Sequence, residues 1–214
     1  MSNGVKDYLK TNFRPRKRAI QQQLYKFAAQ NLPDKALCVV DLPSSDLKHF
    51  GSIKRMKNSG IRVNSYYAYE RDEQIYNGIY SYGRRKSKNC PGRVVVRKKD
   101  VINDLSARSM KNQKFHGKTV DLFNLDFCSA FADTHHLFQL IHGVAMHMNR
   151  QAAVIVTYSL RTNAMIKAKD AVEYAFTKTL ADIYGINVVK RIDKTYKDTT
   201  PMASSCFILV KNNA

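Results

Sequence analysis

Residues 120–131, VDLFNLDFCSAF, predict a buried strand that runs directly into a loop rich in functional groups. The strand is expected over 120–125, where apolar residues dominate, as in a strand covered on both faces of its sheet. The loop carries a carboxylate, an aromatic ring, a thiol and a hydroxyl, on Asp126, Phe127, Cys128 and Ser129. Because ligands bind at the carboxyl ends of strands in open α/β sheets, we expect a site at this turn.

Outward from this stretch, short apolar runs alternate with segments of helical periodicity. The expected strands are 36–40, 61–69, 93–96, 120–125, 152–158, 187–192 and 205–210. The expected helices are 19–31, 46–58, 72–82, 106–114, 133–150 and 164–184. This alternation favours a mostly parallel sheet with helices on both faces. A polar connection over 196–201 joins the last two strands, so we expect them to pair as a hairpin.

Composition places the chain among intracellular globular proteins. A length of 214 residues with 44% hydrophobic residues suits one ordinary domain. Four cysteines without a CxxC pair favour reduced thiols. We expect no signal peptide, because the N-terminus lacks an apolar segment, and no membrane partner, because no apolar run approaches the ~20 residues that span a bilayer. The expected location is the cytoplasm.

The charge points to a polyanionic partner. Thirty-six Lys and Arg stand against 17 Asp and Glu, for a formal net charge of +19. Nucleic acid is the first candidate, an anionic membrane or an acidic protein the second, and a solvated basic surface the structural alternative. A protein partner or homo-oligomer stays open. The expected phosphate contacts are in an N-terminal arm (residues 1–18) and a loop: Arg14, Arg16, Lys17, Arg18, Arg84, Arg85, Lys86 and Lys88.

Tyrosines cluster near this loop in the sequence. They could stack on unpaired bases, although some must belong to the core: Tyr66, Tyr67, Tyr69, Tyr76, Tyr80 and Tyr82. Four histidines fall in 133–150, but none of the pairs has the i, i+4 spacing of a zinc-binding helix. We therefore expect no metal site.

A helix, five strand–helix units and a final hairpin, over about residues 19–212, resemble the Rossmann-like (class I) S-adenosylmethionine-dependent methyltransferases. The resemblance implies a seven-stranded, mostly parallel sheet with a C-terminal antiparallel hairpin. The domain would be residues 19–214, after a basic arm of residues 1–18. It also implies S-adenosylmethionine as the cofactor and methyl transfer as the activity, with nucleic acid as the substrate that the charge favours.

The resemblance assigns cofactor contacts to the ends of the first three strands. Asp41 matches the acid before the family's glycine-rich loop, although Pro43 and Ser44 stand where glycines are expected. Glu70 matches the acid that binds both ribose hydroxyls, and Asp100 matches the position that contacts the adenine amino group. Without the resemblance, each acid could have a purely structural role. Asp41 could cap a helix, and Glu70 and Asp100 could be surface acids paired with their basic neighbours.

The turn after residue 125 corresponds to the family's methyl-acceptor site. Asn124 or Asp126 would accept a hydrogen bond from the target amine, and Phe127 would stack on a flipped base, although the two prolines of amino-methyltransferases are absent. Cys128 could instead attack a pyrimidine, as in carbon-methyltransferases, or simply fill space. The alternative function is an inactive scaffold that binds nucleic acid. The loop over 43–45 distinguishes this scaffold from the enzyme, because a loop without its glycines predicts that the cofactor does not bind.

Overall fold

Seven strands form one sheet in the part of the chain that the computed structural model describes, residues 15–33, 36–43, 51–77, 80, 93–107, 115, 118–127, 134–160, 165–197 and 201–212. Their order across the sheet is β3-β2-β1-β4-β5-β7-β6. The strands are β1 Leu37–Asp41, β2 Val63–Glu70, β3 Arg93–Lys98, β4 Val120–Asp126, β5 Met148–Ser159, β6 Ile186–Lys197 and β7 Pro201–Lys211. β1 to β5 run parallel, and β7 lies antiparallel between β5 and β6. The predicted parallel sheet and C-terminal hairpin are confirmed.

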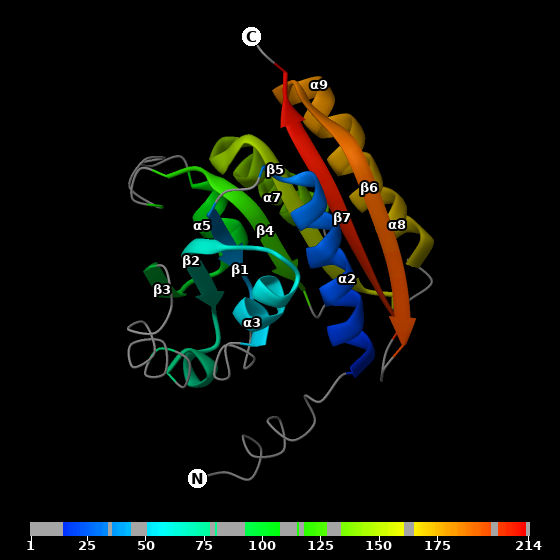
Figure 1. The fold of residues 1–214 in the computed structure, drawn as a ribbon. Helices are drawn as coiled ribbons and strands as arrows, with labels where there is room; N and C mark the ends of the chain where they lie inside the picture. The colour runs from blue at the N-terminus through cyan, green and yellow to red at the C-terminus, as the bar shows by residue number, and fades with distance from the viewer. Residues whose placement is uncertain are drawn as a thin grey trace.

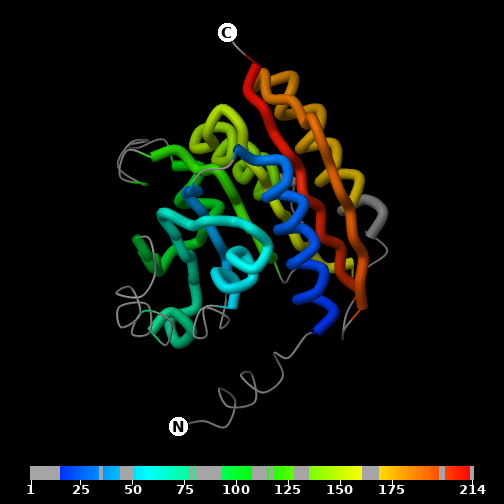
Figure 2. The backbone as a smooth tube through the Cα atoms, in the orientation of Figure 1, coloured from blue at the N-terminus to red at the C-terminus, as the bar shows by residue number. Residues whose placement is uncertain are grey.

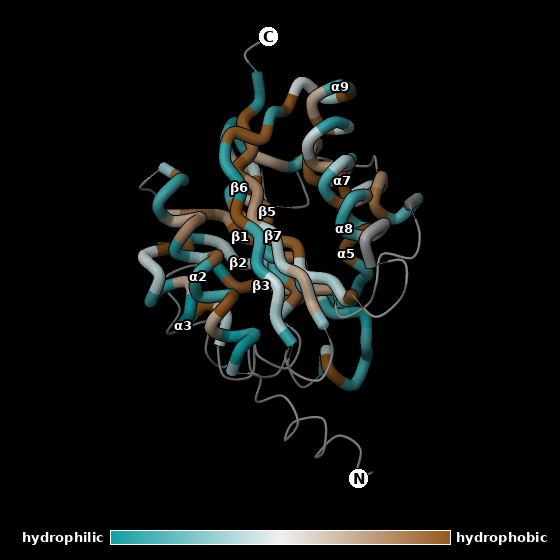
Figure 3. The backbone as a smooth tube through the Cα atoms, turned by 90° about the vertical axis from the view of Figure 1, so that its right-hand side faces the viewer, coloured by the Kyte–Doolittle hydropathy of each residue, from teal (hydrophilic) through white to brown (hydrophobic). Residues whose placement is uncertain are grey.

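Helices cover both faces of this sheet (Figure 1). α2 Pro15–Asn31 and α3 Gly51–Asn58 lie on one side, and α5 Val101–Ser106, α7 Thr134–His147 and α8 Met165–Tyr174 on the other (Figure 3). α8 continues through a π-helical turn, Ala175–Thr179, into α9 Leu180–Tyr184. The hairpin runs as two long neighbouring strands along one edge, coloured orange and red in Figure 2.

Alternating side chains of the central strands fill two separate hydrophobic cores. Successive residues of a strand point to opposite faces, so Val39 and Leu122 belong to the core beneath α2 and α3. Their neighbours Val40 and Phe123 belong to the core beneath α5, α7 and α8. All five residues of β1 are buried, as expected of a central parallel strand.

Several element boundaries differ from the prediction. α2 begins at Pro15 rather than residue 19, because proline suits the first helical position; Arg16, Lys17 and Arg18 therefore lie on a helix and not in an arm. α7 ends at His147, and Met148, which continues its apolar stripe in the sequence, is instead the first residue of β5. α5, Val101–Ser106, was not predicted, and its start is defined by a capping side chain; most of the helix expected over 106–114 lies outside the described residues.

Predicted helix ends and core positions are largely confirmed. Gly185 ends α9 with φ of +61°, the left-handed conformation in which glycine is favoured. Phe176 and Leu180 are buried, but Ile183, which continues their apolar stripe in the sequence, lies in the last turn of α9 and is 63% exposed. No helix of the described ranges is long and apolar enough to cross a membrane. Cys38 and Cys206 are free thiols in the core.

Candidate functional site

A buried carboxylate lies at the carboxyl end of β1, next to the end of β4. Asp41 is fully buried, and it pairs in register with Asn124 of the adjacent strand. Asn124 Nδ2 donates a hydrogen bond to Asp41 Oδ1 at 2.6 Å, and the Tyr66 hydroxyl of β2 donates to Oδ2. Both oxygens of Asp41 are therefore engaged by side chains of the neighbouring strands.

Burial dominates the electrostatics of this cluster. It raises the pKa of Asp41 to about 6, against the opposing effect of the hydrogen bonds from Tyr66 and Asn124. Burial and the nearby Asp41 together raise the pKa values of Tyr66 and of Tyr25, on α2, well above the usual tyrosine value. The tyrosines therefore act as neutral hydrogen-bonding groups around a carboxylate that is costly to ionise.

A second acid lies on the same face of β4, two residues beyond Asn124. Lys17 Nζ of α2 lies 2.5 Å from Asp126 Oδ2, and Gln21 Nε2 donates to the same oxygen at 3.2 Å. The remaining oxygens, Asp126 Oδ1 and Asn124 Oδ1, are buried and have no hydrogen-bond partner among the described residues. Because buried acceptors are ordinarily satisfied, this pair of oxygens is suited to accept hydrogen bonds from a ligand.

Polar residues of β5 extend the site along the sheet edge. Thr157 is in register with Asp126 and hydrogen-bonds the Ser204 hydroxyl at 2.8 Å. Ser159, two residues on, has a buried hydroxyl without a partner in the described part of the chain. Neither these residues nor Gln21 were predicted from the sequence. The signal for Ser159 was available, since Thr157 and Ser159 interrupt the apolar run that begins at residue 152.

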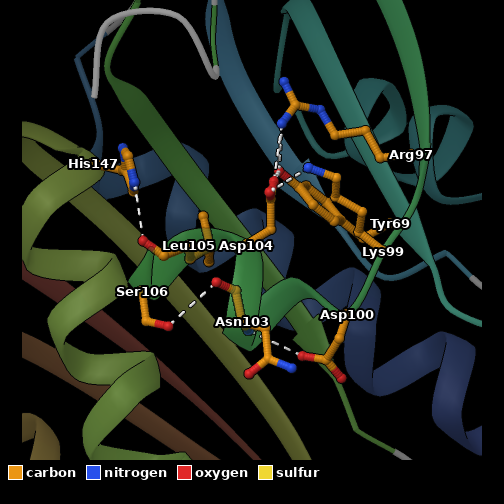
Figure 4. A network of polar contacts seen from close by, with 9 residues as sticks. All are labelled: Tyr69, Arg97, Lys99, Asp100, Asn103, Asp104, Leu105, Ser106 and His147. Carbon is orange, nitrogen blue, oxygen red and sulfur yellow. Dashed lines mark hydrogen bonds and ion pairs between the residues drawn. The ribbon is translucent and has the colours of Figure 1, made fainter. Parts of the chain in front are cut away.

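The other two predicted cofactor acids lie farther along the same edge. Glu70 ends β2, where burial raises the pKa of its carboxyl and its Oε1 accepts the Asp72 N–H at 2.9 Å. Asp100 caps α5. Its Oδ1 accepts the Ile102 N–H at 2.9 Å and the Asn103 N–H at 3.1 Å, the second of which is drawn in Figure 4. Asp100 therefore acts as a helix cap, a structural role that the sequence analysis did not consider for this residue.

The basic neighbours of Asp100 pair with other acids. Lys98 lies 2.7 Å from Glu73, while Lys99 and Arg97 hold Asp104, which also accepts from the Tyr69 hydroxyl (Figure 4). These donors explain why the pKa of the buried Asp104 carboxyl is lowered, although burial alone would raise it.

The aromatic residues expected near the site lie mostly in the core. Tyr66, Tyr67 and Tyr69 are at most 1% exposed, so they are the members of the cluster that belong to the core, and they are not available to stack on bases. Tyr76 and Tyr80 stack on each other with centroids 5.5 Å apart, and Tyr80 is partly exposed.

Phe127 donates its backbone N–H to Thr157 O at 2.8 Å, and its half-buried side chain packs on the core beneath α7. Pro43, predicted to lie in the cofactor loop, is buried. Arg16 of α2, predicted to contact phosphate, donates a hydrogen bond to the Lys197 carbonyl at 2.9 Å. The remaining predicted site residues lie outside the described residues: Arg14, Ser44, Tyr82, Arg84, Arg85, Lys86, Lys88 and Cys128.

Comparisons with known proteins agree on the architecture. No protein-family model matches the chain, and no curated protein matches its sequence. Solved structures do match. Magnesium protoporphyrin IX methyltransferase from Synechocystis PCC 6803, with SAH bound, is 13% identical with a TM-score of 0.59, over 96% of this chain and 87% of that one.

Two further structures match at similar levels. The O-methyltransferase from Bacillus cereus, in complex with SAH, is 13% identical with a TM-score of 0.58, over 94% of this chain and 83% of that one. A putative rRNA methylase from Clostridium thermocellum is 12% identical with a TM-score of 0.57, over 88% and 96%. At these identities the likeness concerns the fold.

Proposed function

Because the chain has the Rossmann-like fold of the class I S-adenosylmethionine-dependent methyltransferases, we propose that it transfers a methyl group from S-adenosylmethionine to nucleic acid. The observation that carries this proposal is the pair of buried, unpartnered acceptors Asn124 Oδ1 and Asp126 Oδ1. They lie at the carboxyl end of β4, the edge at which open α/β sheets bind ligands. A target amine could donate both of its hydrogens to such a pair.

Asp41 acts through Asn124 in this proposal. An amide side chain carries one donor and one acceptor end. Because Asp41 Oδ1 accepts from Asn124 Nδ2, the acceptor Oδ1 is left for the substrate. On α2, Lys17 and Gln21 fix Oδ2 of Asp126, which leaves Oδ1 of that residue available in the same way. Asp41 is thus a positioning residue rather than a direct contact.

The strand ends contain side chains that fit the cofactor. The half-buried carboxylate of Glu70 would bind the ribose, because a carboxylate can accept from two hydroxyls. Asp100 would contact the adenine amino group, and Pro43 and Ser44 would line the loop beyond Asp41. S-adenosylmethionine supplies the activated methyl group, so the protein contributes mainly orientation. Asn124 and Asp126 orient the acceptor, with Phe127 beside it.

Two observations support nucleic acid as the substrate. The net charge of +19 favours a polyphosphate partner, through Arg14, Arg16, Lys17, Arg18 and the basic loop over 84–88. A putative rRNA methylase is among the structural neighbours. For Lys17, phosphate binding would have to compete with its ion pair to Asp126.

Calorimetric titration with S-adenosylmethionine and with its demethylated product tests the cofactor assignment. We expect both to bind, and we expect Glu70→Ala to abolish binding because the ribose loses its acceptor. Glu73→Ala is the matched control, since its side chain is 68% exposed and only three residues away; it should bind as the wild type does. Absence of heat with either compound at millimolar concentration would rule out the proposed methyltransferase activity. Unchanged affinity in Glu70→Ala would show that Glu70 does not bind the ribose.

The buried Pro43 favours a second candidate, an inactive scaffold that binds nucleic acid. Glycine in this loop lets the backbone approach the cofactor closely, and a proline ring occupies that space and lacks an N–H donor. Binding of nucleic acid without any binding of S-adenosylmethionine would establish the scaffold.

A further inference from the structure

Charge is distributed unequally between the two helical layers that cover the sheet. α2 and α3 together carry seven Lys and Arg and not one Asp or Glu. On the opposite side, α5, α7 and the continuous α8–α9 segment carry three lysines and four acids. The basic excess of these two layers is therefore concentrated on one face of the molecule.

This basic layer begins at the candidate site. Lys17, in the first turn of α2, lies against Asp126 at the end of β4. Ser52, the second residue of α3, is buried and hydrogen-bonds Asp41 at the end of β1. Both helices therefore extend from the carboxyl edge of the sheet across the same face, on the side shared by α2 and α3 in Figure 3.

Three lysines of this layer face solvent, while its large apolar side chains are buried or partly buried. Lys26 of α2 and Lys54 and Lys57 of α3 are exposed. The large exposed apolar residues of the described chain all lie elsewhere, at Tyr80, Phe138, Tyr174, Ile183 and Val189. A helix that binds a membrane surface inserts an apolar face between lipids. Here the apolar faces of both helices are used in the core, so the layer suits a hydrated polyanion rather than a bilayer.

We infer that the phosphate backbone of a nucleic acid docks along the outer surface of α2 and α3, with Lys26, Lys54 and Lys57 as phosphate contacts. This inference deepens the proposed function, on which it rests for the role of the bound strand as substrate. Phosphate contacts fix the position of a nucleic acid without reading its sequence. The surface would thus hold the strand so that one nucleotide reaches Asn124 and Asp126.

Two double variants with the same loss of charge test the surface. Lys54→Gln/Lys57→Gln changes the proposed surface, and Lys169→Gln/Lys178→Gln changes exposed lysines of the opposite layer. The affinity of each protein for a short labelled RNA hairpin and for a DNA duplex is measured by fluorescence anisotropy over a series of salt concentrations. The samples contain no S-adenosylmethionine, so loss of docking and failure of methyl transfer are separate results.

Log affinity falls as log salt rises, and each phosphate contact that is lost makes this negative slope shallower by about 0.7–0.9. For Lys54→Gln/Lys57→Gln we expect a slope smaller by about 1.4–1.8, which corresponds to roughly 30-fold weaker binding at ~0.1 M salt. The control pair should stay within about twofold of the wild type, and adding Lys26→Gln should weaken binding further.

Three outcomes would overturn the inference. Equal losses in both double variants would mean that only net charge matters, and unchanged affinity in Lys54→Gln/Lys57→Gln would place docking elsewhere. The third outcome concerns vesicles rich in anionic lipid. If they bind the wild type more tightly than either nucleic acid does, and if this binding also depends on Lys54 and Lys57, the surface binds membranes instead.

Discussion

Ionisation of Asp41 should make the stability of the protein fall as the pH rises. Burial raises the pKa of this carboxyl from 3.8 to about 6. The folded chain therefore holds the proton more tightly than the unfolded chain does. The free energy of unfolding contributed by this group then decreases between about pH 4 and pH 6 and is constant above. A pKa difference of about 2 corresponds to about 3 kcal/mol, at about 1.36 kcal/mol per unit.

Asp41→Asn isolates this contribution, because the amide cannot ionise. Urea unfolding of the wild type and the variant is measured at a series of pH values from 4 to 7. The free energy of unfolding of the wild type, minus that of Asp41→Asn, should fall by about 3 kcal/mol over this range. Tyr66→Phe removes a hydrogen bond to the carboxylate, so it should move the decrease to higher pH. A difference that is the same at pH 4 and pH 7 would refute the reasoning.

Two further substitutions test the packing and the site. A Cβ atom at Gly143 of α7 would lie 2.6 Å from Leu105 Cβ of α5, so Gly143→Ala should lower the free energy of unfolding by about 1–3 kcal/mol; a change below about 0.5 kcal/mol in urea unfolding would show that the two helices can separate freely. Lys17→Met removes the cation beside Asp126 and should slow methyl transfer at saturating substrate while leaving the affinity for S-adenosylmethionine unchanged. An unaltered maximal rate would mean that Lys17 does not position the acid.

Local sequence patterns were sufficient to predict the strands, their mostly parallel arrangement and the hairpin, because period and apolar content reflect burial directly. They were weaker where two patterns coincide, as at Met148, which fits a helical stripe and a strand equally well. The start of α5 depends on the capping side chain of Asp100, and the periodicity of the segment gave no sign of it.

The site itself was predicted only in part. The ends of β1 and β4 were recognised as polar, and the structure brings Asp41 and Asn124 into contact. The partners from α2 were missed, because Gln21 is 105 residues from Asp126 in the sequence and nothing in a local pattern encodes that contact. The charge of Lys17 is visible in the sequence but the acid beside it is not, so its ion pair with Asp126 was missed for the same reason.

Transfer of label from methyl-labelled S-adenosylmethionine to RNA or DNA tests the central claim most directly. We predict that the wild-type protein labels one of these polymers, and that Asp126→Ala, which removes an acceptor at the end of β4, loses most of this activity while staying folded. The proposal is contradicted if the wild-type protein incorporates no more label than a sample without protein.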